Sequence, residues 1–316
     1  MRILAILNPA AGGGTAPGIS RRIRAEVPVT REWDWAIAER RGHATELARA
    51  AAVQHGFDRV VVVGGDGTVY EVANGLAHSD TELAIIPAGT ANDVVRNLGI
   101  PREPAAAATL AATGAARAID LGEAWLDGSM TSFVNSAGIG FDAEVAWRVN
   151  RSSKVLGGTL PYLAGVVRTL WHYASPWLRI SIDGRDIETR VFLLLVGNCP
   201  AYGGGMRIVP DARPDDGVFD VCLVHSLSRL EVLRLIPRLY SGSHVSHPAV
   251  ELFRCGKLEV KKLEVKKLEV SAVSDGGSGR VLCQADGELV GEVPVRFAIR
   301  PGALRCVTGP TPGSVS

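Results

Sequence analysis

The sequence predicts an N-terminal α/β domain with a parallel, doubly wound sheet, followed by a mostly antiparallel β-sandwich domain. In the first third, short apolar strands alternate with helical patterns, an order that produces a parallel sheet. After about Asp120, strand-like runs separated by Asp-Gly turns dominate. The length of 316 residues suits two domains of ordinary size. We expect one domain over 1–121, rejoined by residues 301–316, and the other over 122–300.

Apolar patterning predicts each N-terminal element. Ile3–Leu7 is an apolar run, and the valines at 60–63 form a β-branched run closed by glycines, which is typical of a parallel strand buried on both faces. Leu83–Ile86 repeats that pattern, whereas Trp33–Ile37 alternates with charge as a half-buried strand does. Helices are predicted over His43–His55 and Glu71–Ala77, and in a segment that ends near Asn97.

The remaining chain carries strand-like runs with two helical interruptions, at Tyr162–His172 and Leu230–Tyr240. The predicted strands are Thr131–Asn135, Leu178–Ile182, Val191–Asn198, Val218–Val224, Val281–Gln284 and Val293–Ile299. A five-residue repeat, KLEVK, runs through 257–270. Its lysines favour a solvated sheet edge.

Composition excludes several classes of protein. Hydrophobic residues make up 47% and charged residues 21%, so the chain can fill a core. The net charge of +1 argues against a dedicated nucleic-acid binder, which would be strongly basic. The longest apolar run, 191–196, is too short for a membrane span, and no signal peptide is recognisable. The five cysteines lack a CxxC spacing and are expected to be free thiols in a reducing compartment. The sequence thus predicts a cytoplasmic protein.

Glycine-rich turns follow three of the predicted strands. The strongest is GGDGT at 64–68, where glycines allow close backbone approach to a ligand and the next helix offers unpaired N–H groups to phosphate. An acid in that turn suits Mg²⁺ bridged to phosphates. A plain glycine-rich turn is the alternative, but residues 87–93 and 8–14 repeat the pattern after two other strands. Such turns on adjacent strands predict a phosphate crevice at one sheet edge.

Longer motifs give a specific resemblance. NPAAGGG, GGDGTVYEVANGL and IPAGTANDVVRNLGI resemble the diacylglycerol-kinase catalytic family, which includes bacterial lipid kinases and sphingosine kinases. FVNSAGIGFDAEV, YGGGMRIVPDARPDDGVFDV and QADGE match in the same order, so the resemblance covers nearly the whole chain. NAD kinases share GGDGT but lack GTAND followed by DDG and DGE.

The resemblance implies a role for each of several residues. Glu288 would be the general base, and Asp66, Asp93 and Asp120 would form an acidic network that holds catalytic Mg²⁺ through water. Two positions depart from the family pattern: Tyr70 replaces a usual Asn, and Val218 a common Leu. The implied nucleotide site comprises Asn8, Thr45, Gly64, Gly65, Asp66, Gly67, Thr68, Val69, Tyr70 and Thr90. The implied second Mg²⁺ site comprises Arg213, Asp216 and Val218, with backbone carbonyls of Arg213 and Val218 as ligands.

Simpler interpretations of the acids stay open at this point. Asp216 and Asp286 precede glycines and could be hairpin residues, Asp120 could cap an element, and Glu288 could lie in a surface turn.

Residues 147–177 carry a different signal. Basic side chains alternate there with aromatic ones in a span without acids, and such segments favour anionic lipid headgroups and the water–lipid boundary. The aromatic residues are Trp147, Tyr162, Trp171, Tyr173 and Trp177, and the basic ones are Arg148, Arg151, Lys154, Arg168 and Arg179. The alternative is that these aromatic residues pack the core.

The resemblance implies phosphoryl transfer from ATP, with Mg²⁺, to a lipid hydroxyl, with diacylglycerol or a related lipid as the acceptor. The first domain would be the nucleotide-binding domain and the second the lipid-binding β-sandwich domain. The expected partners are the lipid substrate and, transiently, the inner face of the membrane, with no nucleic acid; a homodimer stays open. Three alternatives remain: a kinase for a soluble substrate such as NAD, a non-catalytic regulator that binds nucleotide or lipid, and a structural module.

Overall fold

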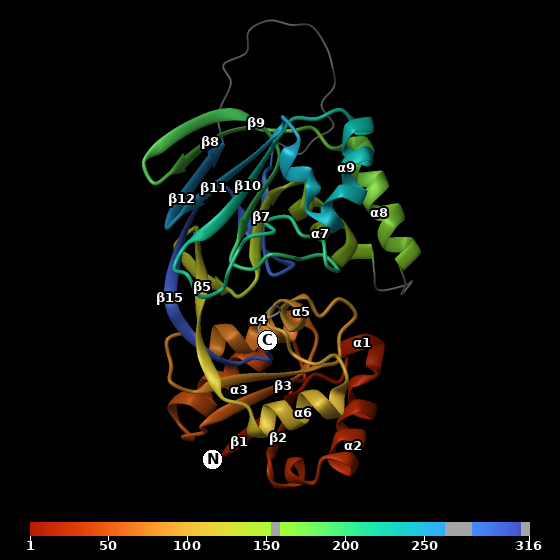
Figure 1. The fold of residues 1–316 in the computed structure, drawn as a ribbon, viewed down its shortest axis with the longest axis vertical. Helices are drawn as coiled ribbons and strands as arrows, with labels where there is room; N and C mark the ends of the chain where they lie inside the picture. Colours follow the sequence, from red (N-terminus) through yellow and green to blue (C-terminus); the bar gives the residue numbers. More distant parts are fainter. Residues whose placement is uncertain (153–158, 263–279, 311–316) are drawn as a thin grey trace, which may run out of the picture.

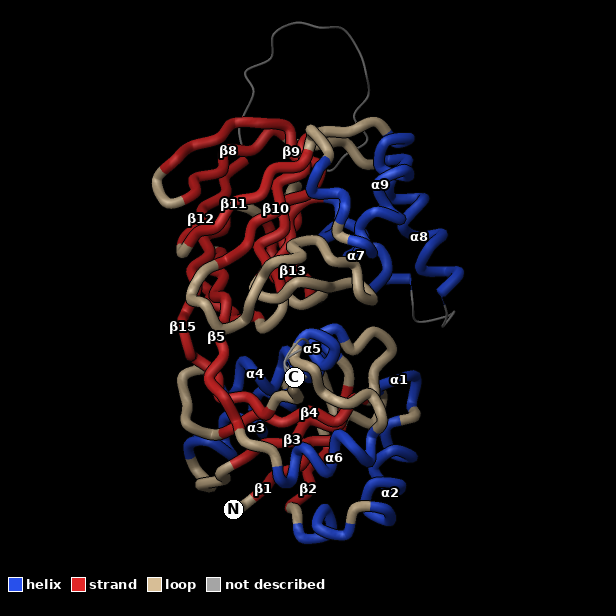
Figure 2. Tube along the Cα trace, viewed as in Figure 1, coloured by secondary structure: helices blue, strands red, loops and turns tan. Residues whose placement is uncertain are grey.

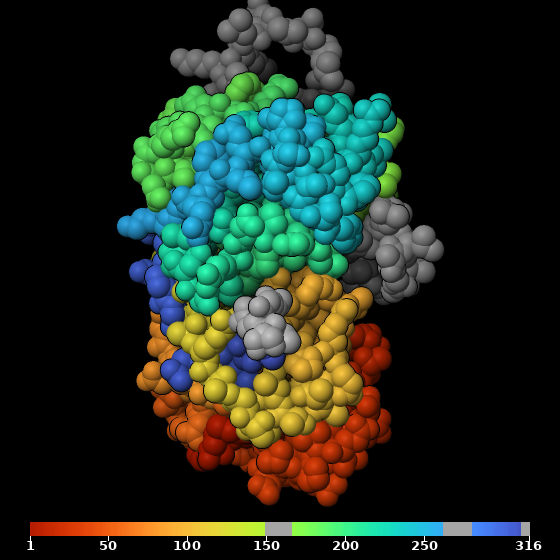
Figure 3. Space-filling model, in the orientation of Figure 1, coloured from red at the N-terminus to blue at the C-terminus, as the bar shows by residue number. Residues whose placement is uncertain are grey.

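The computed structural model describes residues 1–152, 159–262 and 280–310. For residues 149–152, 159–165 and 262 it describes the secondary structure but not the side chains. Two halves lie one above the other (Figure 1), and their surfaces meet along a broad seam (Figure 3). The N-terminal half is α/β with parallel strands and the C-terminal half is a β-sandwich, so the predicted fold class is confirmed.

The N-terminal half is built on a parallel sheet in the order β2-β1-β3-β4. Its strands are β1 (Ile3–Leu7), β2 (Asp34–Ile37), β3 (Arg59–Gly64) and β4 (Glu82–Pro87). Every residue of β1 and β3 is buried, which explains their unbroken apolar runs. The chain leaves β1 toward β2 but leaves β3 toward β4, so the winding reverses between β1 and β3.

Helices cover this sheet in two pairs, because α2 packs against α6 and α3 against α4. They are α1 (Ala11–Gly14), α2 (Ala16–Glu26), the 3-10 turn η1 (Pro28–Glu32), α3 (His43–Val53), α4 (Asp66–Leu76), α5 (Asp93–Asn97) and α6 (Pro104–Thr113). The prediction placed the start of α4 too late, since the helix begins inside the glycine-rich turn, with Gly65 as its N-cap. The sequence analysis also missed α2 and α6. The alanines of α6 leave it without a distinct apolar stripe.

Two long antiparallel strands connect the halves. β5 (Ala116–Leu126) and β15 (Val295–Val307) pair from Trp125↔Arg296 to Ala116↔Val307, with a register shift between Arg300 and Leu304. Near its end β15 also pairs in parallel with β4 through Cys306↔Leu83. The last strand of the chain therefore starts in the C-terminal half and ends in the N-terminal sheet, as Figure 1 shows.

The C-terminal half consists of antiparallel strands that enclose a second core (Figure 2). β9 belongs to both layers, because its first half pairs with β8 and its second half with β7 and β10. Phe133, Phe219 and Phe297 meet in the core, with ring centroids 5.7 and 6.2 Å apart from Phe133. The other strands are β6 (Ser129–Phe133), β7 (Ser136–Gly140), β8 (Trp177–Ile182), β9 (Arg185–Gly197), β10 (Phe219–His225), β11 (Val250–Cys255), β12 (Lys257–Lys262), β13 (Leu282–Ala285) and β14 (Glu288–Glu292).

Three helices lie along one side of this half: α7 (Phe141–Ser152), α8 (Thr159–His172) and α9 (Arg229–Ser241), the last followed by the 3-10 turn η2 (Ser243–Ser246). The helices α8 and α9 agree with the two predicted helical segments, whereas α7 was not predicted. The helix α7 begins directly after the glycine-rich strand β7, without a loop that would mark the change.

The first unit of the KLEVK repeat forms β12, which pairs with β8 on one side and β15 on the other. The expectation of a solvated edge is therefore wrong for this unit: Leu258 and Val260 are buried in the core, whereas Lys257 and Lys261, on the alternate face, are exposed. The rest of the repeat, 263–270, lies outside the described residues.

None of the helices that the structure describes has the length and hydropathy of a bilayer-spanning segment. All five cysteines are free and buried.

Candidate functional site

Three loops meet at the carboxyl edge of the parallel sheet, around the point where its winding reverses. The side-chain amide of Asn8, after β1, donates a hydrogen bond to Thr68 Oγ1 at 2.9 Å. The backbone N–H of Ala88, after β4, donates to the Gly64 carbonyl at 2.8 Å. Open α/β sheets bind ligands in a crevice at this location.

Glycines let these loops approach one another closely. A Cβ atom on Gly89 would lie 2.5 Å from the Cα of Gly65, and a Cβ on Gly64 would lie 2.7 Å from the Thr68 side chain. Neither position accepts a larger residue without moving the backbone. Because α4 starts here with a glycine N-cap, its first N–H groups are available to an anion.

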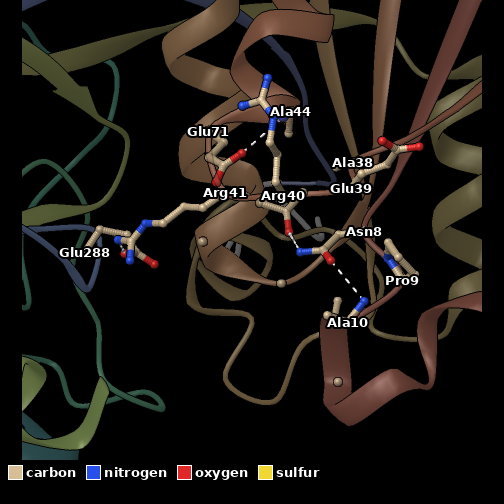
Figure 4. A pocket seen from close by; sticks show the side chains of 15 residues that line it. Asn8, Pro9, Ala10, Ala38, Glu39, Arg40, Arg41, Ala44, Glu71 and Glu288 are labelled. Atoms are coloured by element: carbon tan, nitrogen blue, oxygen red, sulfur yellow. Dashed lines mark hydrogen bonds and ion pairs between the residues drawn. The ribbon is translucent and has the colours of Figure 1, made fainter. Parts of the chain in front are cut away.

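A polar cleft of about 430 Å³ opens beside these loops (Figure 4). It is lined by Asn8, Pro9, Ala10, Ala11, Gly12, Ala38, Glu39, Arg40, Arg41, Ala44, Gly65, Gly67, Thr68, Glu71 and Glu288. All but Glu288 come from the N-terminal half. Four of the residues implied for nucleotide binding (Asn8, Gly65, Gly67 and Thr68) thus line one cleft with the implied base.

The remaining implied nucleotide residues have other positions. Thr45 donates through its hydroxyl to the Glu71 carbonyl at 2.8 Å, and Val69 lies in the core. Thr90 is exposed in the loop after β4. The Tyr70 hydroxyl lies 2.5 Å from the Thr131 hydroxyl, to which it is hydrogen-bonded, and its ring packs against the C-terminal core. Tyr70 is therefore not among the residues that line the cleft.

Glu71 organises the wall of the cleft, a role that the sequence analysis missed. Its carboxylate accepts hydrogen bonds from the backbone N–H groups of Gly42 at 2.8 Å and Ala44 at 3.1 Å. These bonds fix the loop between β2 and α3. The sequence signal that could have indicated this role is the position of Glu71, one turn into the helix that follows GGDGT.

Glu288 reaches into the cleft from the first residue of β14 and forms an ion pair with Arg41. A Cβ atom added to Gly67 would lie 3.1 Å from Glu288 Oε1, so the carboxylate adjoins the first turn of α4. Burial raises the pKa of the Glu288 carboxyl, and the Arg41 guanidinium opposes that rise.

Asp66 and Asp93 begin neighbouring helices and lie close together. Asp66 Oδ1 accepts a hydrogen bond from Val94 N at 3.2 Å, and the Asp93 carboxylate accepts one from Gly204 N at 2.9 Å and pairs with Arg96. Burial, and then the negative charge of Asp93, raise the pKa of Asp66. A buried carboxylate beside a second carboxylate suits a cation such as Mg²⁺, which takes one or two carboxylates together with phosphate oxygens.

Asp120 lies on β5, where this strand passes between the halves. Its carboxylate accepts hydrogen bonds from Gly217 N at 2.7 Å and Gly302 N at 2.8 Å. It therefore joins the 213–218 loop to β15, and its contacts do not include Asp66 or Asp93.

The implied second metal site lies in that loop. Asp216 pairs with Arg254, while the Arg213 guanidinium lies 3.3 Å from Asp215. Val218 donates its N–H to Asp216 Oδ1 at 3.3 Å. Asp220, next to this group, has a buried carboxylate oxygen without a partner, which suits a cation. Among the described residues no three His, Cys, Asp or Glu side chains cluster, so backbone carbonyls would have to contribute.

Asp286 has a structural role that its turn position did not reveal. Its carboxylate accepts hydrogen bonds from the backbone N–H groups of Val134 at 2.7 Å, Asn135 at 2.8 Å and Ser136 at 3.0 Å. Burial raises the pKa of Asp286 to about 6. These contacts tie the turn that carries Glu288 to the start of β7.

An apolar cavity of about 470 Å³ lies in the C-terminal half, between the sheet and α7, α8 and α9. Its wall is formed mainly by aliphatic and aromatic side chains, among them Phe141, Val145, Leu170, Phe192, Met206, Val232, Leu235, Ile236 and Leu239. One end is polar and includes Asp66, Asp93, Asp142, Gln284 and Asp286. The sequence analysis identified none of the cavity wall.

The apolar cavity and the polar cleft share two short segments. Gly65 and Gly67 line the cleft, whereas Asp66 between them lines the cavity. Likewise Glu288 lines the cleft, whereas Asp286 and Gly287 line the cavity. A group bound in one space and a group bound in the other would thus meet at these segments.

The basic and aromatic segment at 147–177 divides into two parts. Tyr173 packs against Phe141 and Phe192, as the core-packing alternative expected. Trp171, by contrast, is 55% exposed and lies under the guanidinium of Arg229, whose carbon is 5.4 Å from the ring centroid.

Comparison with known proteins identifies relatives for both halves. The diacylglycerol kinase catalytic domain matches residues 2–124, and the YegS C-terminal NAD kinase beta sandwich-like domain matches residues 135–308. The chain is 32% identical to a diacylglycerol kinase of Mycobacterium tuberculosis over 96% of this chain and 94% of that protein. It is 33% identical to a Pseudomonas aeruginosa protein named "Probable lipid kinase YegS-like", over 90% of this chain and 89% of that protein.

Solved structures share the whole fold. A crystal structure from Bacillus anthracis superposes with a TM-score of 0.78 at 26% identity, covering 98% of this chain and 95% of that chain.

Proposed function

The chain belongs to the family of diacylglycerol kinases and YegS-like lipid kinases, and we propose that it transfers the γ-phosphate of ATP to the hydroxyl group of diacylglycerol or a related lipid. ATP would occupy the polar cleft, with its phosphates against the glycine-rich loops. The lipid would place its acyl chains in the apolar cavity and its hydroxyl at the polar end.

The observation that carries this proposal is the junction of the two cavities. A lipid kinase must hold an anionic nucleotide and an apolar acceptor on either side of one reacting point. The segments Gly65–Gly67 and Asp286–Glu288 contribute residues to both spaces. Holding both reactants in this geometry would make the transfer effectively intramolecular.

Mg²⁺ would be held by Asp66, supported by the adjacent Asp93, together with the phosphates of ATP. When bound, it would offset negative charge on the transferring phosphoryl group. The 213–218 loop offers a second cation site through Asp216 and backbone carbonyls, and Asp120 links that loop to β15.

Glu288 is the residue proposed to move the proton. Its carboxylate would accept the proton of the lipid hydroxyl as the hydroxyl oxygen attacks the γ-phosphorus and the bond to the β-phosphate oxygen breaks, so that ADP leaves with the electron pair. The raised pKa of Glu288 makes it a better base than an exposed carboxylate. Both oxygens of Asp286 already accept backbone hydrogen bonds, which favours a positioning role for it.

The cavity also favours lipid over a soluble acceptor such as NAD. A nicotinamide dinucleotide carries two phosphates and two ribose groups, and an aliphatic wall would leave these groups without hydrogen-bond partners.

Filling the cavity is expected to impair lipid phosphorylation selectively. Ala146 of α7 lines the cavity, and in Ala146→Phe the larger ring would occupy the space proposed for acyl chains. We expect kcat/KM for a diacylglycerol acceptor to fall about tenfold or more, with the KM for ATP unchanged. Ala106→Phe, at an exposed position on α6, is the matched control and should behave as the parent. Equal activity of both variants would show that the acceptor does not enter the cavity.

We further propose that the mouth of the cavity docks on an anionic bilayer. Val167, Leu233 and Tyr240 line the cavity and are 41%, 39% and 55% exposed, so apolar surface continues outward from it. The same two helices carry arginines: Arg168 on α8, and Arg229, Arg234 and Arg238 on α9. Basic residues beside exposed aromatic residues suit anionic headgroups and the lipid boundary.

The double substitution Arg168→Ala and Trp171→Ala tests this docking face. We expect binding to phosphatidylglycerol-containing vesicles to weaken at least fivefold, about the contribution of one basic residue at a bilayer surface, with ATP affinity unchanged. The matched control is Arg49→Ala with Val53→Ala, an exposed pair on α3. Co-sedimentation with vesicles measures both variants. If both variants bind vesicles like the parent, the mouth of the cavity is not the surface that docks on the bilayer.

A further inference from the structure

The Arg41–Glu288 ion pair joins the two halves inside the polar cleft. Arg41 lies in the loop after β2, and Glu288 begins β14. Figure 4 shows the two side chains extending toward each other across the cleft. The guanidinium side chain is 74% exposed and the carboxylate side chain 26%, so the cation lies on the solvent side of the pair. Nothing in the sequence motifs accounts for Arg41.

The charges of the cleft make this pair important for an anionic ligand. The acids that line it are Glu39, Glu71 and Glu288, and the cations are Arg40 and Arg41. Glu71 is already engaged with two backbone N–H groups, and Arg40 is held at 2.6 Å by Glu46 outside the cleft. Arg41 is therefore the cation whose ion-pair partner also lines the cleft. That partner, Glu288, is the proposed base.

Resting on the proposed function, we propose that Arg41 exchanges partners during the reaction. In the empty cleft it pairs with Glu288; when ATP binds, it turns to the γ-phosphate and releases Glu288. The guanidinium fork binds a phosphate as well as it binds a carboxylate. The exchange delivers positive charge to the transferring group and frees Glu288 to accept the hydroxyl proton in the same event.

The location of the pair supports this exchange. Glu288 Oε1 adjoins Gly67 in the first turn of α4, where the phosphates would bind, so Arg41 needs only to turn aside to reach them. The exposure of Arg41 leaves room for that movement. Burial raises the pKa of Glu288, so once Arg41 has turned away the carboxylate is the more basic.

The test is calorimetric binding of a non-hydrolysable imido analogue of ATP to the full chain. Because Glu288 competes for Arg41 and repels phosphate, Glu288→Gln should bind the analogue more tightly than the parent. Arg41→Gln should bind it about tenfold more weakly, the effect of losing a charge-assisted hydrogen bond. ADP, which lacks the γ-phosphate, should lose less affinity on Arg41→Gln than the analogue does.

The matched control is a variant of Arg22, which lies outside the cleft. Arg22→Gln removes an exposed arginine that pairs with Glu26 at 2.8 Å and Glu103 at 2.9 Å, and should bind the analogue as the parent does. If the pair only braces the two halves, Glu288→Gln and Arg41→Gln should weaken binding alike, which would overturn the exchange. Parent-like binding by Arg41→Gln would overturn it as well. A parent protein that binds no triphosphate would contradict the proposed function itself.

Discussion

Replacing Asp66 by Asn is expected to abolish phosphoryl transfer while the fold is retained. Asp66 occupies the glycine-rich turn after β3, lines the polar end of the apolar cavity and lies beside Asp93. The amide keeps the shape and can still accept the hydrogen bond from Val94 N, but it removes the charge that would hold Mg²⁺. Losing several kcal/mol of transition-state stabilisation lowers kcat by about 10³-fold or more.

The measurement is steady-state lipid phosphorylation at saturating ATP, with circular dichroism as the check on folding. Asp80→Asn, an exposed position in the same half, is the matched control and should retain parent activity. Because burial and Asp93 disfavour the charge on Asp66, the variant should be at least as stable as the parent near neutral pH. A folded Asp66→Asn protein with near-normal turnover would remove Asp66 from the reaction.

Replacing Glu288 by Gln should slow turnover by roughly 10²–10⁴-fold, the range for loss of a general base. The glutamine cannot accept a proton but keeps the length of the side chain, and it removes the ion pair with Arg41. ATP affinity should not fall, so the loss should appear in kcat.

Glu292→Gln is the matched control for this prediction. Glu292 ends the same strand, β14, and pairs with Arg280 at 3.4 Å on the surface. Its turnover should equal that of the parent. If Glu288→Gln instead raised the KM for ATP with kcat unchanged, Glu288 would be a nucleotide-binding residue rather than the base.

The N-terminal half was predictable because its signals are local. The valines of β3 had to be buried on both faces, and the glycines after them had to form a tight turn, so a phosphate crevice followed from the order of strands and helices. The same reasoning could not find where Asp120 lies. Its position beside Gly217 and Gly302 depends on β5 and β15 crossing between the halves, which no local pattern encodes.

The apolar cavity was not predictable for a related reason. Its wall combines α7, α8 and α9 with β9 and β10. The apolar pattern of each element alone is also typical of ordinary core packing. The ion pair between Glu288 and Arg41 was equally unpredictable from the sequence. Arg41 lies 247 residues before it in the chain, in a loop whose course is set by Glu71. The family resemblance implied the role of Glu288, but only the fold brings it to the cleft.

Lipid phosphorylation is tested by transfer of ³²P from γ-labelled ATP, with Mg²⁺, into a total lipid extract resolved by chromatography. We expect a labelled lipid phosphate that forms with the parent chain and is lost with Asp66→Asn. The same reaction with NAD in place of lipid should give no labelled product. Label in NAD and none in any lipid would contradict the assignment of this chain as a lipid kinase.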